Sequence, residues 1–338
     1  MRAVSDPGCV ARLDAALWQW SVAQGSVPVS ERPLAVAFSG GVDSSALLHR
    51  AHAMWPGAVR AIHVNHGLQA SAADFEAHCV SVAQHWGVPL RVVRVRVQCG
   101  AGDSVEEQAR QSRYAALARE AASWGVGRVL LAQHADDQAE TVLLALSRGS
   151  GVPGLAAMGS SVVHSGLRFD RPWLDVRRRD IADCVRALGL SAIDDPSNAD
   201  TRFSRNRLRH RVLPVLEAEF PAVVTALGRT ARHCAQANEL LLALAQEDAA
   251  AVGSPPRLAA LRALSPARRV NALRAWLVAC AGRAPSTAQL DELCKQIAAA
   301  TTRGHAIHLR IVTGWVERSD DCLVYLPVPP LPLPQVLG

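Results

Sequence analysis

Residues 39–44, Ser-Gly-Gly-Val-Asp-Ser, have the residue types of an anion-binding turn. Gly40 and Gly41 allow positive φ and a close approach of the backbone, so successive N–H groups can converge on an anion. Ser39 and Ser44 add hydroxyl donors of little bulk. Because the stretch lies between a short apolar run and a helix-like run, the positive end of a helix dipole would face the same anion. The pattern indicates a site for phosphate groups.

An ordinary strand-to-helix turn with a serine cap would use similar residues, but the complete pattern is more selective. A P-loop would need G-x-x-x-x-G-K-[ST] and a dinucleotide fingerprint would need G-x-G-x-x-G, and this turn has neither. Asp43 is an acid inside an anion-binding turn, where carboxylate and phosphate repel each other unless a cation lies between them. We therefore expect Mg²⁺ between Asp43 and phosphate.

A second candidate site is the acidic stretch HADDQAET at residues 134–141. Asp136, Asp137 and Glu140 lie at the start of a predicted helix, and capping of its N-terminus explains one or two of them. Asp137 and Glu140 are three residues apart and share a helix face, so together they could bind a cation. The cation could be a substrate amine or a second metal.

A third candidate is TRFSRNRLRHR at residues 201–211, which has five arginines and no acid. Lys295 is the single lysine among 36 basic residues, so arginine clusters partly reflect a general preference for arginine. A solvated helix face is therefore one interpretation. The other is contact with nucleic-acid phosphates, for which log affinity falls with log salt by about 0.7 to 0.9 per contact.

The elements that position these segments follow from an alternation of short apolar runs and helix-like runs over roughly the first two hundred residues. This alternation predicts an α/β fold with a doubly wound parallel sheet. In such a sheet, ligands bind beyond the carboxyl ends of the strands, where the turn and the acidic stretch both lie. Strands are predicted at 34–38, 59–64, 90–97 and 128–132, and helices at 44–54, 71–86, 104–124 and 136–147.

The character of the chain changes after residue 213, where long helices rich in Ala, Leu and Arg begin. Helices are predicted at 214–251, 265–280 and 286–300, followed by short β-like pieces. We therefore expect two domains, an α/β domain at 1–213 and a mainly helical domain with short terminal β segments at 214–338.

Composition restricts the function further. A chain of 338 residues with 49% hydrophobic residues can bury a sizeable core, and a net charge of +6 permits an anionic partner. Mechanisms that need a lysine inside a motif would have to use Lys295. The eight cysteines lack the close spacing of zinc or iron–sulfur sites. Charges interrupt the apolar stretches near the N-terminus, so we expect no signal peptide, no membrane span and a cytoplasmic location.

The turn SGGVDS resembles the PP-loop of the ATP pyrophosphatases, which have an adenine nucleotide alpha hydrolase-like fold and cleave ATP between its α- and β-phosphates. Other segments resemble the tRNA(Ile)-lysidine synthetase family in order and spacing through the first 214 residues. They are HVNHGL at 63–68, RQSRYAAL at 110–117, HADDQAET at 134–141, RGSGVPGLAAM at 148–158, RPWLD at 171–175 and DDPSNADTRFSRNRLRHRVLP at 194–214. ARRVNALRAWL at 267–277 resembles the helical domain of that family more loosely.

The resemblance implies a role for individual residues. ATP, with Mg²⁺ at Asp43, would be bound by Ser39, Gly40, Gly41, Val42, Asp43, Ser44 and His66. The substrate L-lysine would be bound by Arg113, Asp137 and Glu140. The catalytic residues would be Asp43, Asp137, Glu140 and Arg205, and the tRNA-binding residues Arg202, Arg205, Asn206, Arg207 and Arg209.

The resemblance also implies the reaction. The C2 oxygen of the wobble cytidine in a CAU-anticodon tRNA(Ile) would attack the α-phosphate of ATP, and the ε-amine of L-lysine would then displace AMP to give lysidine. A tRNA-thiolating PP-loop enzyme is an alternative, but it usually needs a cysteine pair that this spacing lacks. A non-catalytic ATP- or RNA-binding module is another, although it has little use for carboxylates beside ATP. A homodimer is compatible with the sequence.

Overall fold

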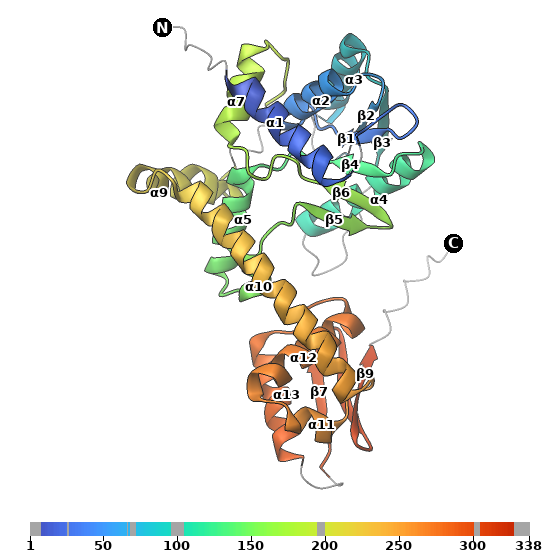
Figure 1. Ribbon diagram of the computed structural model, residues 1–338, viewed down its shortest axis with the longest axis vertical. Helices are drawn as coiled ribbons and strands as arrows, with labels where there is room; N and C mark the ends of the chain where they lie inside the picture. The colour runs from blue at the N-terminus through green and yellow to red at the C-terminus, as the bar shows by residue number, and fades with distance from the viewer. Residues whose placement is uncertain are drawn as a thin grey trace, which may run out of the picture. The chain divides into compact units, whose positions relative to one another are not determined.

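A computed structural model describes residues 8–25, 27–65, 67, 72–95, 105–194, 200–300 and 305–327 of the chain. Contacts divide the chain into two compact units, Met1–Ala235 and Gln236–Gly338 (Figure 1). Leu213 and Val224 pack against Ala135 in one apolar cluster, so the residues that follow position 213 belong with the first unit. The expected boundary between 213 and 214 stays a prediction about the functional domains.

Among the described residues, the first unit has a six-stranded sheet with the order β3-β2-β1-β4-β6-β5. Neighbouring strands are parallel except at the edge, where β5 and β6 are antiparallel. The prediction of a parallel α/β sheet is confirmed, although the β5–β6 pair was not predicted. The strands are β1 (Leu34–Ala37), β2 (Val59–Asn65), β3 (Leu90–Arg94), β4 (Arg128–Leu130), β5 (Ser161–His164) and β6 (Leu167–Asp170).

The helices predicted between these strands are confirmed as α2, α3, α4 and α5. The third predicted strand, 90–97, ends at Arg94, and its last two residues lie outside the described residues. The helices of this unit are α1 (Gly8–Ala23), α2 (Val42–Met54), α3 (Ala72–Trp86), α4 (Val105–Ser123), α5 (Ala135–Ser147), α6 (Val152–Leu155), α7 (Arg178–Ala187), α8 (Ser204–Arg207) and α9 (Leu213–Glu219), with a π-helical turn, η2 (Leu208–Val212), between α8 and α9.

The two faces of the sheet are covered by different helices. Leu34 and Val36 of β1 join a core cluster with side chains of α1, α2 and α7, whereas Ala35 joins the cluster formed with α4. Figure 1 shows α1, α2 and α7 side by side over this part of the sheet. Because β1 is buried on both faces, its sequence is an apolar run without alternation.

The order of the strands also determines where a ligand can bind. β1 lies between β2 and β4, so the chain moves toward one edge after β1 and returns to the other side of β1 at β4. This is a topological switch point, and the loops that leave the two strands there separate to form a crevice. The loop after β1 contains residues 39–41, and the loop after β4 leads into α5.

In the second unit, α11 (Leu258–Ala263), α12 (Pro266–Ala281) and α13 (Thr287–Ala299) pack around buried leucines. An antiparallel sheet follows, made of β7 (His308–Ile311), β8 (Gly314–Ser319) and β9 (Cys322–Pro327). The helices expected at 265–280 and 286–300 and the terminal β pieces are confirmed.

The single helix predicted over 214–251 is wrong. The chain forms α9 and then α10 (Val223–Val252), which starts in the first unit and ends in the second. Phe220 lies between the two helices with φ −131° and ψ 83°. It precedes Pro221, and a residue before proline avoids the α region because of the proline ring. Within the described residues, no helix has both the length and the apolar character needed to cross a membrane.

Candidate active site

The turn after β1 and the start of α5 enclose a cavity of about 560 Å³ at the carboxyl edge of the sheet. Of the predicted site residues, the cavity is lined by Ser39, Gly41, Val42, Asp43, Ser44, Arg113, Asp137, Arg205 and Arg209. Glu140 contacts two of these residues from beneath. His66 lies outside the described residues. The structure therefore brings together most of the ATP-binding and lysine-binding residues implied by the resemblance.

Position 40 needs a glycine both because of its backbone conformation and because of the atoms next to it. Its φ is 83°, and a Cβ built on it would lie 2.9 Å from Sγ of the buried Cys79. The carbonyl oxygen of Gly40 accepts the N–H of Ile193 at 2.9 Å, which joins the turn to the segment after α7. Gly41 has φ −76° and precedes α2 as its N-cap residue. Of the two glycines that would allow positive φ, only Gly40 has it.

The two serines of the turn stabilise its shape. The Ser44 hydroxyl donates to the carbonyl oxygen of Gly41 at 3.1 Å and accepts the N–H of Ser39 at 3.2 Å. The hydroxyl groups of Ser39 and Ser44 lie 2.9 Å apart. These bonds hold the backbone of the turn in one conformation before a ligand binds.

Asp43 lies in the first turn of α2, and its carboxylate faces the start of α5. Its Oδ2 is 3.7 Å from Nε2 of His134. Burial raises the pKa of Asp43, but His134, with smaller contributions from Arg178 and Arg209, lowers it by more, and the net pKa is below its ordinary value. Oδ1 is buried and has no hydrogen-bond partner among the described residues. One carboxylate oxygen is therefore available for a ligand.

His134 connects the turn after β1, residues 39–44, to the acidic stretch. It is the N-cap residue of α5, and its Nδ1 accepts the N–H of Asp137 while the Asp137 side chain accepts the N–H of His134. With Nδ1 as an acceptor, the proton of the neutral ring is on Nε2, the nitrogen nearest Asp43. Burial lowers the pKa of His134, but the neighbouring carboxylates raise it above its ordinary value.

Asp136, the first acid of the stretch, has different partners from Asp137 and Glu140. Asp136 accepts both Nε and Nη2 of Arg177, at 3.3 and 3.2 Å, and the backbone N–H of Arg178 at 2.8 Å. Arg177 also pairs with Glu217 of α9. Asp136 is therefore a structural residue that holds α5, α7 and α9 together.

Asp137 and Glu140 share a face of α5, as the spacing predicted, and both bind Arg209. The guanidinium of Arg209 donates to Oδ1 of Asp137 at 3.1 Å and to Oε1 and Oε2 of Glu140 at 2.6 and 3.2 Å. Glu140 is fully buried. Its burial raises the pKa, Arg209 opposes this effect, and the net pKa is above its ordinary value. This pair of carboxylates binds a cation in the structure, which is the arginine of a later segment.

The side chains of the arginine segment, residues 201–211, lie in different surroundings and do not form one solvent-exposed face. Arg202 is exposed and pairs with Asp200 at 2.8 Å. Arg205 donates to the hydroxyl of Thr141 at 2.8 Å and lies 3.4 Å from Oε2 of Glu140. Asn206 donates to the carbonyl oxygen of Asp200 at 2.9 Å. Arg207 and Arg211 lie outside this cavity.

Sequence reasoning missed two residues of the site. His134 was quoted within the acidic stretch but given no role, although its position before the first acid suits an N-cap. Arg178 lines the cavity and lowers the pKa of Asp43. It follows the strand β6 as the first residue of α7, so its place at the carboxyl edge of the sheet was a signal that could have found it.

The described cysteines do not form a reactive site. Cys9, Cys79 and Cys184 are buried, and each described cysteine is a free thiol. Across the described residues, no group of three or more His, Cys, Asp and Glu side chains could hold a metal ion.

Comparisons with known proteins define the class first: residues 17–216 match the PP-loop domain, and the chain is a PP-loop protein. Residues 257–324 match the TilS substrate binding domain. The chain is 49% identical to the tRNA(Ile)-lysidine synthase of Polaromonas naphthalenivorans (strain CJ2), over 88% of this chain and 90% of that protein. It is 45% identical to that of Ralstonia nicotianae (strain ATCC BAA-1114 / GMI1000), over 84% of this chain and 62% of that protein. The chain belongs to the tRNA(Ile)-lysidine synthase family.

A solved structure agrees with the fold. The U34-tRNA thiolase NcsA from Methanococcus maripaludis with its [4Fe-4S] cluster superposes with a TM-score of 0.57 and 17% identity, covering 67% of this chain and 78% of that chain. At this identity the likeness extends to the fold alone.

Proposed function

We propose that this protein ligates L-lysine to C2 of the wobble cytidine in a CAU-anticodon tRNA(Ile), using ATP and releasing AMP and pyrophosphate. One observation carries the proposal. A single imidazole, that of His134, separates the ATP turn from the acidic pair, with Nε2 at 3.7 Å from Asp43 and 3.4 Å from Asp137. An ATP phosphate at the turn and an amine at the acidic pair would therefore lie close together, as a two-step ligation needs.

In the first step, the cytidine C2 oxygen attacks the α-phosphate and pyrophosphate leaves. The backbone N–H groups of the turn hold the phosphates that become pyrophosphate, and the hydroxyls of Ser39 and Ser44 keep that backbone in shape. Arg178 and Arg205 both line the cavity and supply positive charge where negative charge builds up during attack. In the second step, the ε-amine of lysine displaces AMP from C2 and loses a proton.

The acidic pair selects the amine by charge. Arg209 and Arg205 together balance the two carboxylates, so the ammonium group of lysine can bind there without excess positive charge if it takes the place of Arg205. Arg205 lies 3.4 Å from Glu140 and is about two-fifths exposed, so it can turn toward substrate when lysine enters. The exposed Arg113 at the same cavity suits the carboxylate of free lysine.

The residues present fit a magnesium ion shared with ATP. Asp43 offers a buried carboxylate oxygen that has no partner among the described residues, and its lowered pKa keeps it ionised. Asp43 is the residue that would hold Mg²⁺, with phosphate oxygens completing the ligands. When bound, Mg²⁺ supplies charge neutralisation at the phosphates. The cytoplasmic location expected for an enzyme of tRNA, and a homodimer, are parts of the proposal that localisation and sedimentation measurements would check.

The proposed function is tested by measuring the transfer of lysine to RNA. The protein is incubated with ATP, radiolabelled lysine and a tRNA(Ile) transcript with a CAU anticodon, and label is measured in the RNA. Label should appear only with ATP, and a transcript with uridine at the wobble position should stay unlabelled. Release of pyrophosphate without transfer of lysine would contradict the proposal and indicate another PP-loop activity.

A further inference from the structure

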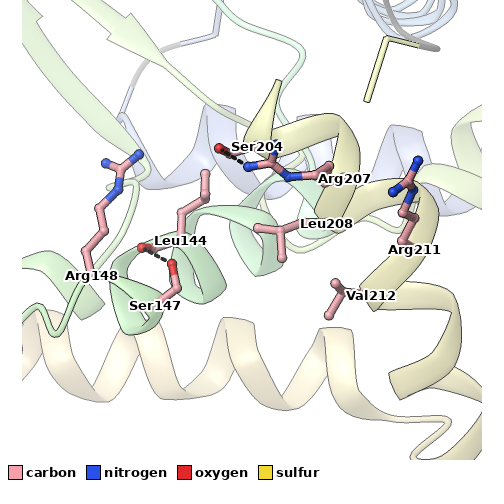
Figure 2. A pocket seen from close by; sticks show the side chains of 8 residues that line it. All are labelled: Leu144, Ser147, Arg148, Ser204, Arg207, Leu208, Arg211 and Val212. Carbon is pink, nitrogen blue, oxygen red and sulfur yellow. Dashed lines mark hydrogen bonds between the residues drawn. The ribbon is translucent and has the colours of Figure 1, made fainter. Parts of the chain in front are cut away.

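A second hollow of about 290 Å³ lies between α5 and the arginine segment (Figure 2). We call it the arginine hollow. Figure 2 shows three guanidinium groups spread around a group of apolar side chains. The hollow is lined by Leu144, Ser147, Arg148, Ser204, Arg207, Leu208, Arg211 and Val212.

Among the described residues, no acid neutralises the positive charge of the arginine hollow. None of its lining side chains is a carboxylate. Arg207 donates to the carbonyl oxygen of Arg202 and to the hydroxyl of Ser204, and Arg211 donates to the hydroxyl of Thr201. In the described part of the chain, Arg148, Arg207 and Arg211 have no carboxylate partner. Guanidinium groups in this state are suited to bind phosphate oxygens.

The helix geometry separates this hollow from the reaction cavity. Arg205 and Arg209 are four residues apart and share one face, and both contact Glu140. Arg207 and Arg211 are also four residues apart, and they share a different face, which lines the hollow. Alternate arginines of one segment thus serve two sites.

The distance between the two sites matches a short length of RNA. Glu140 and Ser147 both lie on α5, two turns apart, which is about 10 Å at 1.5 Å per residue. A stacked strand rises about 3.4 Å per nucleotide. A nucleotide about three positions from one held near Glu140 would therefore reach the hollow.

We propose that the arginine hollow binds one unpaired nucleotide of the RNA substrate, close in sequence to the modified cytidine. Arg148, Arg207 and Arg211 contact its flanking phosphates, and the base lies on the apolar side chains between them. This inference rests on the proposed function, which supplies the RNA. The apolar side chains favour an unpaired nucleotide because a paired base could not turn into the hollow.

The test removes two of the three charges from the hollow. In the double variant Arg148→Gln/Arg211→Gln, a fluorescent anticodon stem-loop should bind about tenfold more weakly, and the log–log salt slope should become shallower by about 1.4. The affinity for ATP and the unfolding temperature should not change. The matched control, Arg119→Gln/Arg186→Gln, loses two exposed arginines on α4 and α7 and should bind the stem-loop as the wild type does.

A blunt RNA duplex serves as the second probe, because it offers phosphates and no unpaired base. The double variant should bind the duplex nearly as well as the wild type does. The proposal would be overturned if the double variant lost equal affinity for both probes or if the control variant lost as much affinity for the stem-loop. An unchanged salt slope would overturn it as well. If the wild type bound the stem-loop through the hollow and yet transferred no lysine to RNA, the proposed function would fail and the nucleotide site would stand.

Discussion

We propose that the turn after β1 and the arginine segment both bind nucleotide phosphates, and the two regions would do so with different parts of the chain. The turn uses backbone N–H groups, and its shape depends on Gly40 and on two serine hydroxyls within six residues of each other. The arginine segment uses long side chains whose directions are set by partners on α5 and elsewhere, such as Glu140 for Arg209. A backbone site is determined locally, whereas a side-chain site is determined by tertiary contacts.

The largest expected effect tests whether Arg209 depends on its tertiary partner. In Arg209→Gln, the fully buried Glu140 loses its bidentate partner. Arg205, at 3.4 Å, compensates the charge of Glu140 only in part, so breaking this buried pair should lower the free energy of unfolding by about 3 kcal/mol. The measurement is urea denaturation, with Arg211→Gln as the control, whose change should stay within about 0.5 kcal/mol. If the free energy of unfolding changed by a similarly small amount in both variants, Arg209 would depend on its tertiary partner no more than Arg211 does.

The next effect is on catalysis at the turn. In Asp43→Asn, the fold should be retained while single-turnover release of pyrophosphate slows by about 10²–10³-fold, because a group that acts on the phosphates is lost. Rapid-quench assays with tRNA and ATP measure this rate. Asp175→Asn, which changes a carboxylate that is 77% exposed, is the control. A rate near that of the wild type would remove Asp43 from the mechanism.

A smaller effect should come from the backbone of the turn. Gly40→Ala adds a Cβ at 2.9 Å from Sγ of Cys79 and places alanine at φ 83°. A non-glycine residue in this region costs about 1–3 kcal/mol. We expect weaker ATP binding by calorimetry, and adding Cys79→Ala should restore only part of it because the φ strain remains. Complete recovery in the double variant would mean that the clash with sulfur alone requires glycine here.

The smallest expected effect concerns Asp136, which has a structural role, in contrast to Asp137 and Glu140 of the proposed lysine site. Burial raises the pKa of Asp136, but Arg177 and the N–H of Arg178 lower it by more, to below its ordinary value of 3.8. Its stabilising contribution is therefore present above pH 3.8 and is lost as the pH falls through the folded pKa. Because asparagine keeps one acceptor oxygen, Asp136→Asn should cost about 1 kcal/mol at pH 7 and less near pH 2. Denaturation curves at both pH values check this, and an equal cost at both would contradict the ionic role.

The sequence predicted the features that arise locally. The apolar runs located four strands, and the glycine and serine pattern located the turn between β1 and α2. It could not show that Asp136 pairs with α7, because that depends on Arg177, some 40 residues away in sequence. It also could not show which arginines of residues 201–211 turn inward. The break at Phe220 was local, and the signal for it was Pro221.

Cys79, which lies beneath the ATP turn, bears on the response of the protein to oxidants. Its Sγ contacts Nδ1 of the buried His63 at 3.3 Å, and burial raises the pKa of the thiol to about 12. Oxidants attack the thiolate, which is scarce at neutral pH for a thiol with such a pKa. An added sulfenic oxygen would press on Gly40, where there is no room for even a methyl group. Because the thiol is kept protonated and out of solvent, the ATP turn rests on a sulfur atom that is protected from oxidation.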